Sequence, residues 1–407
     1  MLSRFWRHSR SSALASAAVA GTAAAALAAG VIATTPASAR SVAQPRVAAP
    51  QAATPQAAAP QAATPRVAAP QAAVPWASVR AGWVLTEYSL GTASKPAPTT
   101  LYLVSPSGGK YAVYQWAASK TAAPRLVAWS GDKGRALLEL GSPIQFEQLN
   151  LRTGKAARFS LPADVQPVGY TRPSGLQLLG TATGDSTATL ARYTLAGKRA
   201  QVLGTQAFAF GMTAIYTPDG TALAVSANTG LLLVSNTGRV IRKLPVAAAD
   251  PRIGCRAVRW WNPGTILAEC TPKGGDLAQL WLVPANGAKP KALTPVRKSG
   301  TDLGDLDAWA LPSGLYLQSA GACGLLELNK QAKNGSVASV PLPGLPAGTS
   351  VAVVTALGPQ LLLHGRGCTL GGQLVWFNPA TKAEKWVFKT GAETVVPYYS
   401  TENSSLS

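Results

Sequence analysis

Few side chains in this sequence are suited to catalysis. The chain has 407 residues, with 2 His and 17 acidic residues, and one of the two His, His8, lies in the N-terminal segment. His364 sits in an apolar stretch, LLLHGRGC, which favours a packed structural residue over a member of a Ser-His-acid triad, and no GxSxG motif accompanies it. Paired carboxylates, as in glycoside hydrolysis, remain open as an acid–base alternative.

The densest group of acids is the segment TDLGDLD at 301–307. It places Asp302, Asp305 and Asp307 within one short stretch, and carboxylate oxygens are ligands that Ca²⁺ accepts. The spacing does not match an EF-hand loop, which needs further ligands and a late Glu. We therefore expect an acidic turn that precedes a strand, with a Ca²⁺ site as the alternative.

The four cysteines are Cys255, Cys270, Cys323 and Cys368. In an exported chain an even count favours disulfides, and four cysteines allow three pairings. Cys255 begins one expected strand and Cys270 ends the next, so the two should lie opposite each other, while Cys323 and Cys368 each precede the third strand of a repeat. We predict the pairs 255–270 and 323–368, with a zinc site as the alternative.

One short pattern recurs along the chain and predicts the elements that hold these residues. Two or three apolar residues are followed, in all copies but one, by an aromatic residue, in seven copies spaced 41 to 49 residues apart. The copies are LVAWS (126–130), PVGYT (167–171), TAIYT (213–217), AVRWW (257–261), LDAWA (306–310), AVVTA (352–356) and VVPYY (395–399). A period of about 40–50 residues built from short strands is typical of a β-propeller.

A hairpin with a turn rich in Gly or Asn also recurs seven times, for example LLLVSNTGRVIRKL at 231–244. We therefore expect an all-β fold, a seven-bladed β-propeller of four-stranded antiparallel blades. The first blade lacks its own copy of the aromatic pattern. The C-terminal copy at 395–399 is expected to complete blade 1 as its innermost strand and so to close the ring.

In a propeller the loops between second and third strands, and those between blades, emerge on one face. All four cysteines and the longest loops fall on that face. Loops on a rigid scaffold usually carry binding. The candidate residues for a binding face are Arg252, Lys273, Asp276, Arg297, Lys298, Asp302, Asp305, Asp307 and Arg366.

The segment YTPDGTALAV (216–225) resembles the repeat of the TolB-like (WD-repeat-like) β-propeller family, in which an aromatic, a Ser/Thr-Pro-Asp-Gly turn and an apolar strand recur in each blade. WNPGTILAE (261–269) and ALPSGLYLQ (310–318) are degraded copies. The resemblance implies a secreted bacterial member. Family members are mostly exported binding or scaffold proteins, and related propellers precede peptidase domains.

The N-terminus predicts export. Residues 1–39 combine basic residues, an Ala-rich apolar stretch and Ala37-Ser38-Ala39, as in a signal peptide, with a membrane anchor as the alternative. Residues 40–80 form a Pro/Ala/Gln-rich linker with pentad repeats at 46–75, expected to be disordered and either a spacer or a low-complexity tail. The propeller is expected over 81–400 and a disordered tail over 401–407.

The formal net charge of +20 predicts attraction to anionic partners. Nucleic acid is not expected, because the chain is exported and its basic residues are scattered. We predict a secreted or extracytoplasmic, monomeric, non-enzymatic protein without a cofactor or a membrane span in the mature chain. It would bind a protein or an anionic envelope polymer through its loops. The alternative is a hydrolase or lyase that uses Asp302, Asp305 or Asp307 with Arg252 or Arg366.

Overall fold

The structure is a computed structural model. It describes residues 66–67, 74–92, 94–118, 124–141, 144–184, 187–207, 213–275, 277–297, 304–321, 325–346, 348–367 and 372–398. The predicted signal segment and C-terminal tail, and most of the predicted linker, lie outside these residues. No helix in the described ranges has the length and apolar character needed to cross a membrane. The one helical element of these ranges is a short 3-10 turn, η1 (Trp76–Ser78).

The described residues form antiparallel sheets, most of them from strands that follow one another in sequence. The first sheet has the order β1-β4-β3-β2-β29. Its strands are β1 (Arg66–Val67), β2 (Val84–Tyr88), β3 (Thr99–Val104), β4 (Lys110–Trp116) and β29 (Ala392–Pro397).

The next two sheets have four strands each, in the orders β5-β6-β7-β8 and β12-β11-β10-β9. Their strands are β5 (Arg125–Trp129), β6 (Arg135–Leu140), β7 (Gln145–Asn150), β8 (Ala156–Phe159), β9 (Val165–Tyr170), β10 (Gln177–Thr183), β11 (Thr187–Thr194) and β12 (Arg199–Ala207).

One large sheet follows and contains eight strands, in the order β16-β15-β14-β17-β18-β19-β20 with β13 paired to β14. Its strands are β13 (Ala214–Tyr216), β14 (Ala222–Ala227), β15 (Gly230–Ser235), β16 (Val240–Pro245), β17 (Cys255–Asn262), β18 (Thr265–Cys270), β19 (Gln279–Pro284) and β20 (Lys291–Ala292).

The last two sheets again have four strands each. They contain β21 (Asp305–Leu311), β22 (Gly314–Ala320), β23 (Leu326–Gln331) and β24 (Val337–Ser339), then β25 (Ser350–Leu357), β26 (Gln360–Arg366), β27 (Gln373–Asn378) and β28 (Ala383–Phe388).

The expectation of seven separate four-stranded blades is wrong. Five of the sheets are four-stranded antiparallel blades, one of them extended by β1, and the remaining strands form the single eight-stranded sheet. The cause is the short strand β13, which pairs with β14 only from Leu223 to Val225. The end of β14 is therefore left to pair with the next inner strand, at Ala227 and Cys255, and this joins two predicted blades into one sheet.

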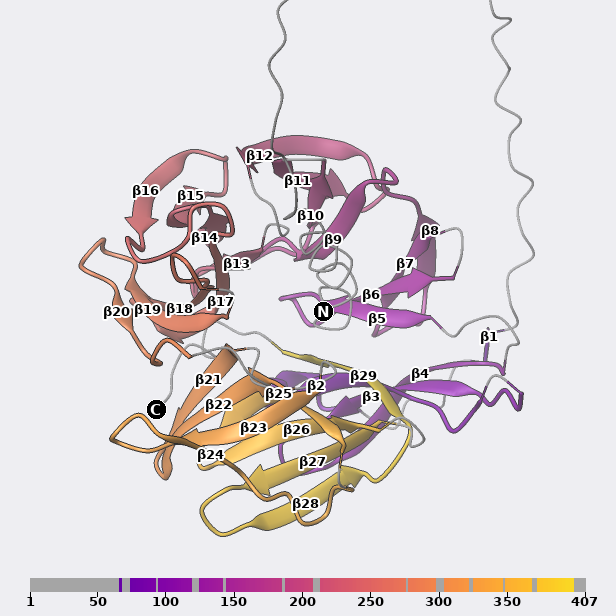
Figure 1. The fold of residues 1–407 in the computed structure, drawn as a ribbon. Coiled ribbons are helices and arrows are strands. Elements are labelled where there is room, and N and C mark those ends of the chain that lie inside the picture. Colours follow the sequence, from indigo (N-terminus) through magenta and orange to yellow (C-terminus); the bar gives the residue numbers. More distant parts are fainter. Residues whose placement is uncertain are drawn as a thin grey trace, which may run out of the picture. The chain divides into compact units, whose positions relative to one another are not determined.

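The sheets follow one another around a ring, as Figure 1 shows for the strands of residues 84–397. Neighbouring sheets meet through their innermost strands, since β5 contacts both β29 and β9, and β25 contacts β29. Strand β29 pairs with β2 from Val84–Pro397 to Tyr88–Ala392. The C-terminal strand thus completes the first sheet and closes the ring, so no edge is left open at the junction.

The recurring aromatic residues lie between neighbouring sheets at the ends of the inner strands. The rings of Trp129 and Tyr398 are 5.0 Å apart, and the Tyr398 hydroxyl donates to the Gly131 carbonyl at 2.8 Å. The Trp260 indole N–H likewise donates to the Tyr216 carbonyl at 2.6 Å. These aromatic residues therefore join the inner strand of one repeat to that of the next, which explains their recurrence in the sequence.

A β-bulge precedes the aromatic position in several inner strands. One residue drops out of register with the second strand at Val127, Val168, Val258, Leu306 and Val354. A bulge bends a strand and changes which face the following side chains meet. The residues before the bulge, at the start of each inner strand, therefore follow a different alternation of faces from the residues after it.

Candidate functional site: arginines on the loop face

Two ends of the ring can be defined from the strand register. We call the end at which inner strands begin and second strands end the loop face, and the opposite end, where turns join these strands, the turn face. Of the predicted binding residues that the structure describes, Arg252, Lys273, Arg297, Asp305 and Arg366 lie at the loop face.

The first feature of the loop face is a repeated ion pair between the first and second strands of a sheet. Arg125 lies directly opposite Glu139 in β5 and β6, and their side chains form an ion pair. Arg256 lies directly opposite Glu269 in β17 and β18, and this pair is also bonded. The same cross-strand position thus carries the same charge pair in two sheets.

A third pair lies on the outer strands of the second sheet. Arg158 of β8 is opposite Glu147 of β7, and the Arg158 Nε donates to Glu147 Oε2 at 3.2 Å. Glu147 follows the loop after the second strand, and Arg158 precedes the next inner strand. Because Glu147 lies opposite Leu138 of β6, this pair is on the other face of the sheet from Arg125 and Glu139.

Two further pairs come from the loops before inner strands. Arg297 forms a forked pair with Asp305, with Nη2–Oδ1 at 2.6 Å and Nε–Oδ2 at 3.2 Å, and the Ser319 hydroxyl donates to Asp305 Oδ1 at 2.9 Å. Arg252 binds Asp250 in the same forked manner, at 2.7 and 3.1 Å. These contacts hold the pKa of Asp250 at about 2, because Arg252 and backbone amides stabilise its charged form.

In all five loop-face pairs the carboxylate is less exposed than the arginine. The side chain of Asp250 is 4% exposed and that of Arg252 is 81% exposed, while Asp305 is fully buried and Arg297 is 13% exposed. The pairs of Arg125, Arg158 and Arg256 follow the same order. The Asp132–Arg135 pair of the turn face has the reverse order, with the carboxylate at 38% and the arginine at 25%.

In each of these five pairs the positive group therefore belongs to the more exposed side chain. The carboxylates bond to the guanidinium groups and so fix the positions of the more exposed arginine side chains. A guanidinium presents a planar set of donors that matches a carboxylate or phosphate group. We refer to Arg125, Arg158, Arg252, Arg256 and Arg297 as the loop-face arginines.

The structure separates the acids that the sequence grouped as a possible Ca²⁺ site. Asp305 is bound to Arg297, whereas Asp307 accepts a hydrogen bond from Arg259 Nε at 2.9 Å. The Arg259 guanidinium lies over the rings of Trp261 and Trp309, at 5.4 and 5.2 Å. Burial raises the pKa of Asp307, and Arg259 opposes this shift. Asp302 lies outside the described residues.

No group of three His, Cys, Asp or Glu side chains in the described ranges is arranged to hold a metal ion.

The other predicted binding residues divide into two sets. Lys273 and Arg366 are exposed on the loop face. Asp276, Lys298, Cys323 and Cys368 lie outside the described residues. Cys255 and Cys270, the first predicted pair, form a disulfide with a Cα–Cα distance of 4.2 Å at the directly paired position of β17 and β18.

Two titratable groups are buried near the same end of the ring. His364 is 9% exposed, and its Nε2 lies 2.7 Å from the Ala392 carbonyl. Burial lowers the His364 pKa to about 4, so the ring is neutral at pH 7 and its Nε2–H donates to that carbonyl. Glu87 of β2 is 2% exposed, and burial raises its pKa to about 8.

The sequence interpretation missed Arg125, Arg158 and Arg256 and the acids that hold them. The repeated signal was present, because an arginine at the start of an inner strand is followed 14 or 13 residues later by a glutamate at the end of the second strand. The outer pair, Arg158 with Glu147, repeats nothing in the other sheets. Only the strand register identifies that pair.

Comparison with known proteins gives similarity of fold. No family model and no curated protein sequence matches this chain. Among solved structures, a prolyl endopeptidase is similar over 75% of this chain and 49% of its own, at 13% identity and a TM-score of 0.49. TolB from Acinetobacter baumannii is similar over 78% of this chain and 66% of its own, at 13% identity and a TM-score of 0.44.

The β-propeller domain of the Trilobed protease from Pyrococcus furiosus is similar over 76% of this chain and 95% of its own, at 10% identity and a TM-score of 0.46. The chain spans about half the length of the prolyl endopeptidase that it resembles. In its fold, this chain is similar to β-propeller proteins that include TolB.

Proposed function

We propose that this protein is an extracytoplasmic, non-enzymatic β-propeller that binds an anionic envelope polymer, or an acidic surface of a partner protein, through its loop face. The observation that carries the proposal is the common order of the five loop-face pairs. In each pair the carboxylate is the more buried partner and the guanidinium is the more exposed one.

The positions of the charges explain why an anionic ligand would bind at this face. The buried carboxylate neutralises each pair as a whole, but the positive end faces solvent, where an anionic ligand can approach it. Arg366 and Lys273 add two exposed cations to the same face. Charges grouped within about 10 Å of one another act together on a polyanion at moderate ionic strength.

The alternative of a hydrolase or lyase has weaker support. Asp305 is fully buried in its pair with Arg297. Asp307 accepts a hydrogen bond from Arg259, whose guanidinium lies over two tryptophan rings. A general acid or base must reach its substrate with a free proton-accepting atom. Neither carboxylate offers the open, adjacent pair that such a reaction needs.

The test is binding of the full chain to polyphosphate and to poly-L-glutamate, with neutral dextran as the reference. The variant Arg252→Gln/Arg366→Gln removes two exposed loop-face cations. The control Lys289→Gln/Lys333→Gln removes two exposed cations from turns at the opposite end of the sheets. We expect the loop-face variant to bind at least one polyanion about tenfold more weakly, since each exposed charge contact contributes about 0.5–1 kcal/mol.

Higher salt should weaken the binding of the wild type more than that of the loop-face variant. The proposal fails if both double variants lose affinity equally, because the binding would then reflect net charge alone. It also fails if the wild type binds dextran as well as it binds the polyanions.

A further inference from the structure

A separate pocket of about 460 Å³ lies on the turn face, and none of the loop-face arginines lines it. It lies at the β9–β10 turn, beside the end of β11 and the β15–β16 turn. The lining residues are Thr171, Arg172, Ser174, Leu176, Gln177, Arg192 and Asn236. Arg172 of the β9–β10 turn and Arg192 of β11 therefore share one pocket with hydroxyl and amide groups, and no carboxylate is among the lining residues.

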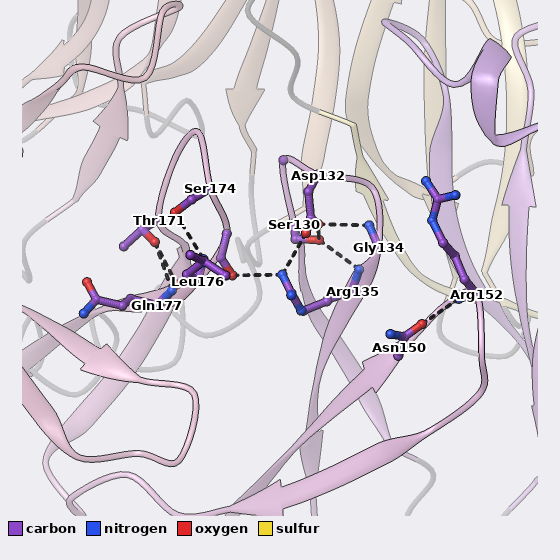
Figure 2. Close-up of polar contacts among 12 residues, drawn as sticks. Ser130, Asp132, Gly134, Arg135, Asn150, Arg152, Thr171, Ser174, Leu176 and Gln177 are labelled. Atoms are coloured by element: carbon purple, nitrogen blue, oxygen red, sulfur yellow. Dashed lines mark hydrogen bonds and ion pairs between the residues drawn. The ribbon is translucent and has the colours of Figure 1, made fainter.

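The pocket wall is held in place by hydrogen bonds of the β9–β10 turn. Figure 2 shows Thr171 and Gln177 bonded to each other beside Ser174 and Leu176, with Arg135 extending toward this turn from the neighbouring hairpin. Arg135 Nη1 donates to the Gly175 carbonyl at 3.3 Å and to Asp132 Oδ2 at 2.7 Å. The turn is thus braced before any ligand arrives, which lowers the entropic cost of binding.

Arg192 lines the pocket from β11. It lies on β11, on the same side as Ala188 and Leu190, whose apolar side chains pack against the next sheet. Its Nε is buried and has no hydrogen-bond partner among the described residues, and none of the described ion pairs includes it. A partly buried guanidinium without a carboxylate beside it is costly, and an anion in the pocket would offset that cost.

Asn236 of the β15–β16 turn contacts the neighbouring turn of the same sheet. Its Nδ2 donates to the Gly220 carbonyl at 2.9 Å, which fixes the amide, and its Oδ1 is buried without a partner among the described residues. The Tyr216 hydroxyl lies close to Arg192, and burial raises its pKa, so it remains a neutral hydroxyl. The pocket therefore has a guanidinium that lies beside a neutral hydroxyl and has no ion-pair partner among the described residues.

We propose that this pocket binds a small hydroxylated oxyanion, a sugar phosphate or a sugar acid. Arg192, with Arg172, takes the phosphate or carboxylate group, and the polar side chains of Ser174 and Gln177 meet a hydroxyl of the same ligand. A neutral sugar would leave Arg192 without a counter-charge.

The experiment is isothermal titration of the full chain with glycerol 3-phosphate, with gluconate and with glucose. We expect one of the two anions to bind at least tenfold more tightly than glucose. Tighter binding of glycerol 3-phosphate would identify a phosphate ligand, and tighter binding of gluconate a carboxylate ligand. Arg192→Gln should weaken that binding at least tenfold. Arg199→Gln, an exposed arginine on β12 of the same sheet, should leave it unchanged.

A second variant keeps the test decisive if Arg192→Gln does not fold. Leu176 is 60% exposed at the pocket rim, so Leu176→Glu should fold and should repel the anion. The proposal is overturned if neither anion binds more tightly than glucose, or if Leu176→Glu and a folded Arg192→Gln keep the wild-type affinity. Arg252→Gln/Arg366→Gln should bind these small probes normally, which separates this pocket from the loop face.

Discussion

Arg256 faces Glu269 across β17 and β18 in the same way that Arg125 faces Glu139 across β5 and β6. In both pairs the glutamate is the more buried partner, and burial raises the pKa of Glu269. The arginine therefore stabilises a carboxylate that its surroundings disfavour. The same ion pairs therefore place arginines on the loop face and stabilise the sheets that carry them.

Removing the arginine of this pair should destabilise the fold. We expect Arg256→Gln to lower the free energy of unfolding by about 2 kcal/mol at pH 7, because Glu269 is left partly buried without its counter-charge. Arg256→Gln/Glu269→Gln should recover more than half of that loss. Urea unfolding of Arg256→Gln, Glu269→Gln and the double variant measures the coupling energy between the two side chains. Additive effects of the two substitutions would show that the pair does not interact.

Stability should depend on pH through Glu87. Its pKa is about 8 in the folded protein and 4.5 in the reference state, so the folded protein holds the proton that the unfolded chain releases between these values. The free energy of unfolding therefore falls as pH rises from about 4.5 to 8, by up to about 1.4 kcal/mol per pH unit. Below this pH window Glu87 is protonated in both the folded and the unfolded state, so it adds no pH dependence to the free energy of unfolding.

Glu87→Gln removes this titration, so the variant should gain stability relative to the wild type as pH rises to 8. The free energy of unfolding measured at pH 5, 6.5 and 8 gives its slope against pH for the wild type and for Glu87→Gln. Parallel slopes for the two proteins would contradict the assignment of a buried, protonated Glu87.

The disulfide between Cys255 and Cys270 should stabilise the eight-stranded sheet. Its sequence separation of 15 residues corresponds to about 3 kcal/mol in the chain-entropy account. We expect Cys255→Ala/Cys270→Ala to unfold at a lower temperature in calorimetry. Its melting temperature should match that of Cys255→Ala alone, since either change breaks the bond, and a large difference between the two variants would argue against the pairing.

Gly372 allows the close contact between β26 and the closing strand β29. A Cβ at this position would lie 1.7 Å from the Ala392 carbonyl oxygen and 2.7 Å from His364 Nε2. Gly372→Ala should therefore cost about 2–3 kcal/mol through displaced backbone. Gly141→Ala is the matched control, because a Cβ there meets nothing within 4 Å. Equal thermal stability of the two variants would exclude the predicted clash.

Much of the fold could be predicted because its signals are local. The aromatic residue at the end of an inner strand, as at Trp129 and Trp260, repeats with the blade and identifies the strand that carries it. The closing role of the C-terminal strand followed from the missing copy in the first blade. The first cysteine pair followed from strand ends that flank one turn.

The number of separate sheets could not be predicted in the same way. It depends on whether Ala227 pairs with Cys255, and that contact joins two repeats whose individual patterns are intact. The loop-face arginines were missed for a related reason. Arg158 and Glu147 meet through register, and the burial that distinguishes a fixed carboxylate from an exposed one, as at Asp250, has no signature in the local sequence.

The most direct test of the proposed function is the ratio of polyanion dissociation constants between two double variants measured at low salt. The loop-face variant is Arg252→Gln/Arg366→Gln, and the turn-face control is Lys289→Gln/Lys333→Gln, so both lose the same charge. Guanidinium recognition at the loop face predicts a ratio of about ten. A ratio near one would contradict it, because the position of the charges would then have no influence on binding.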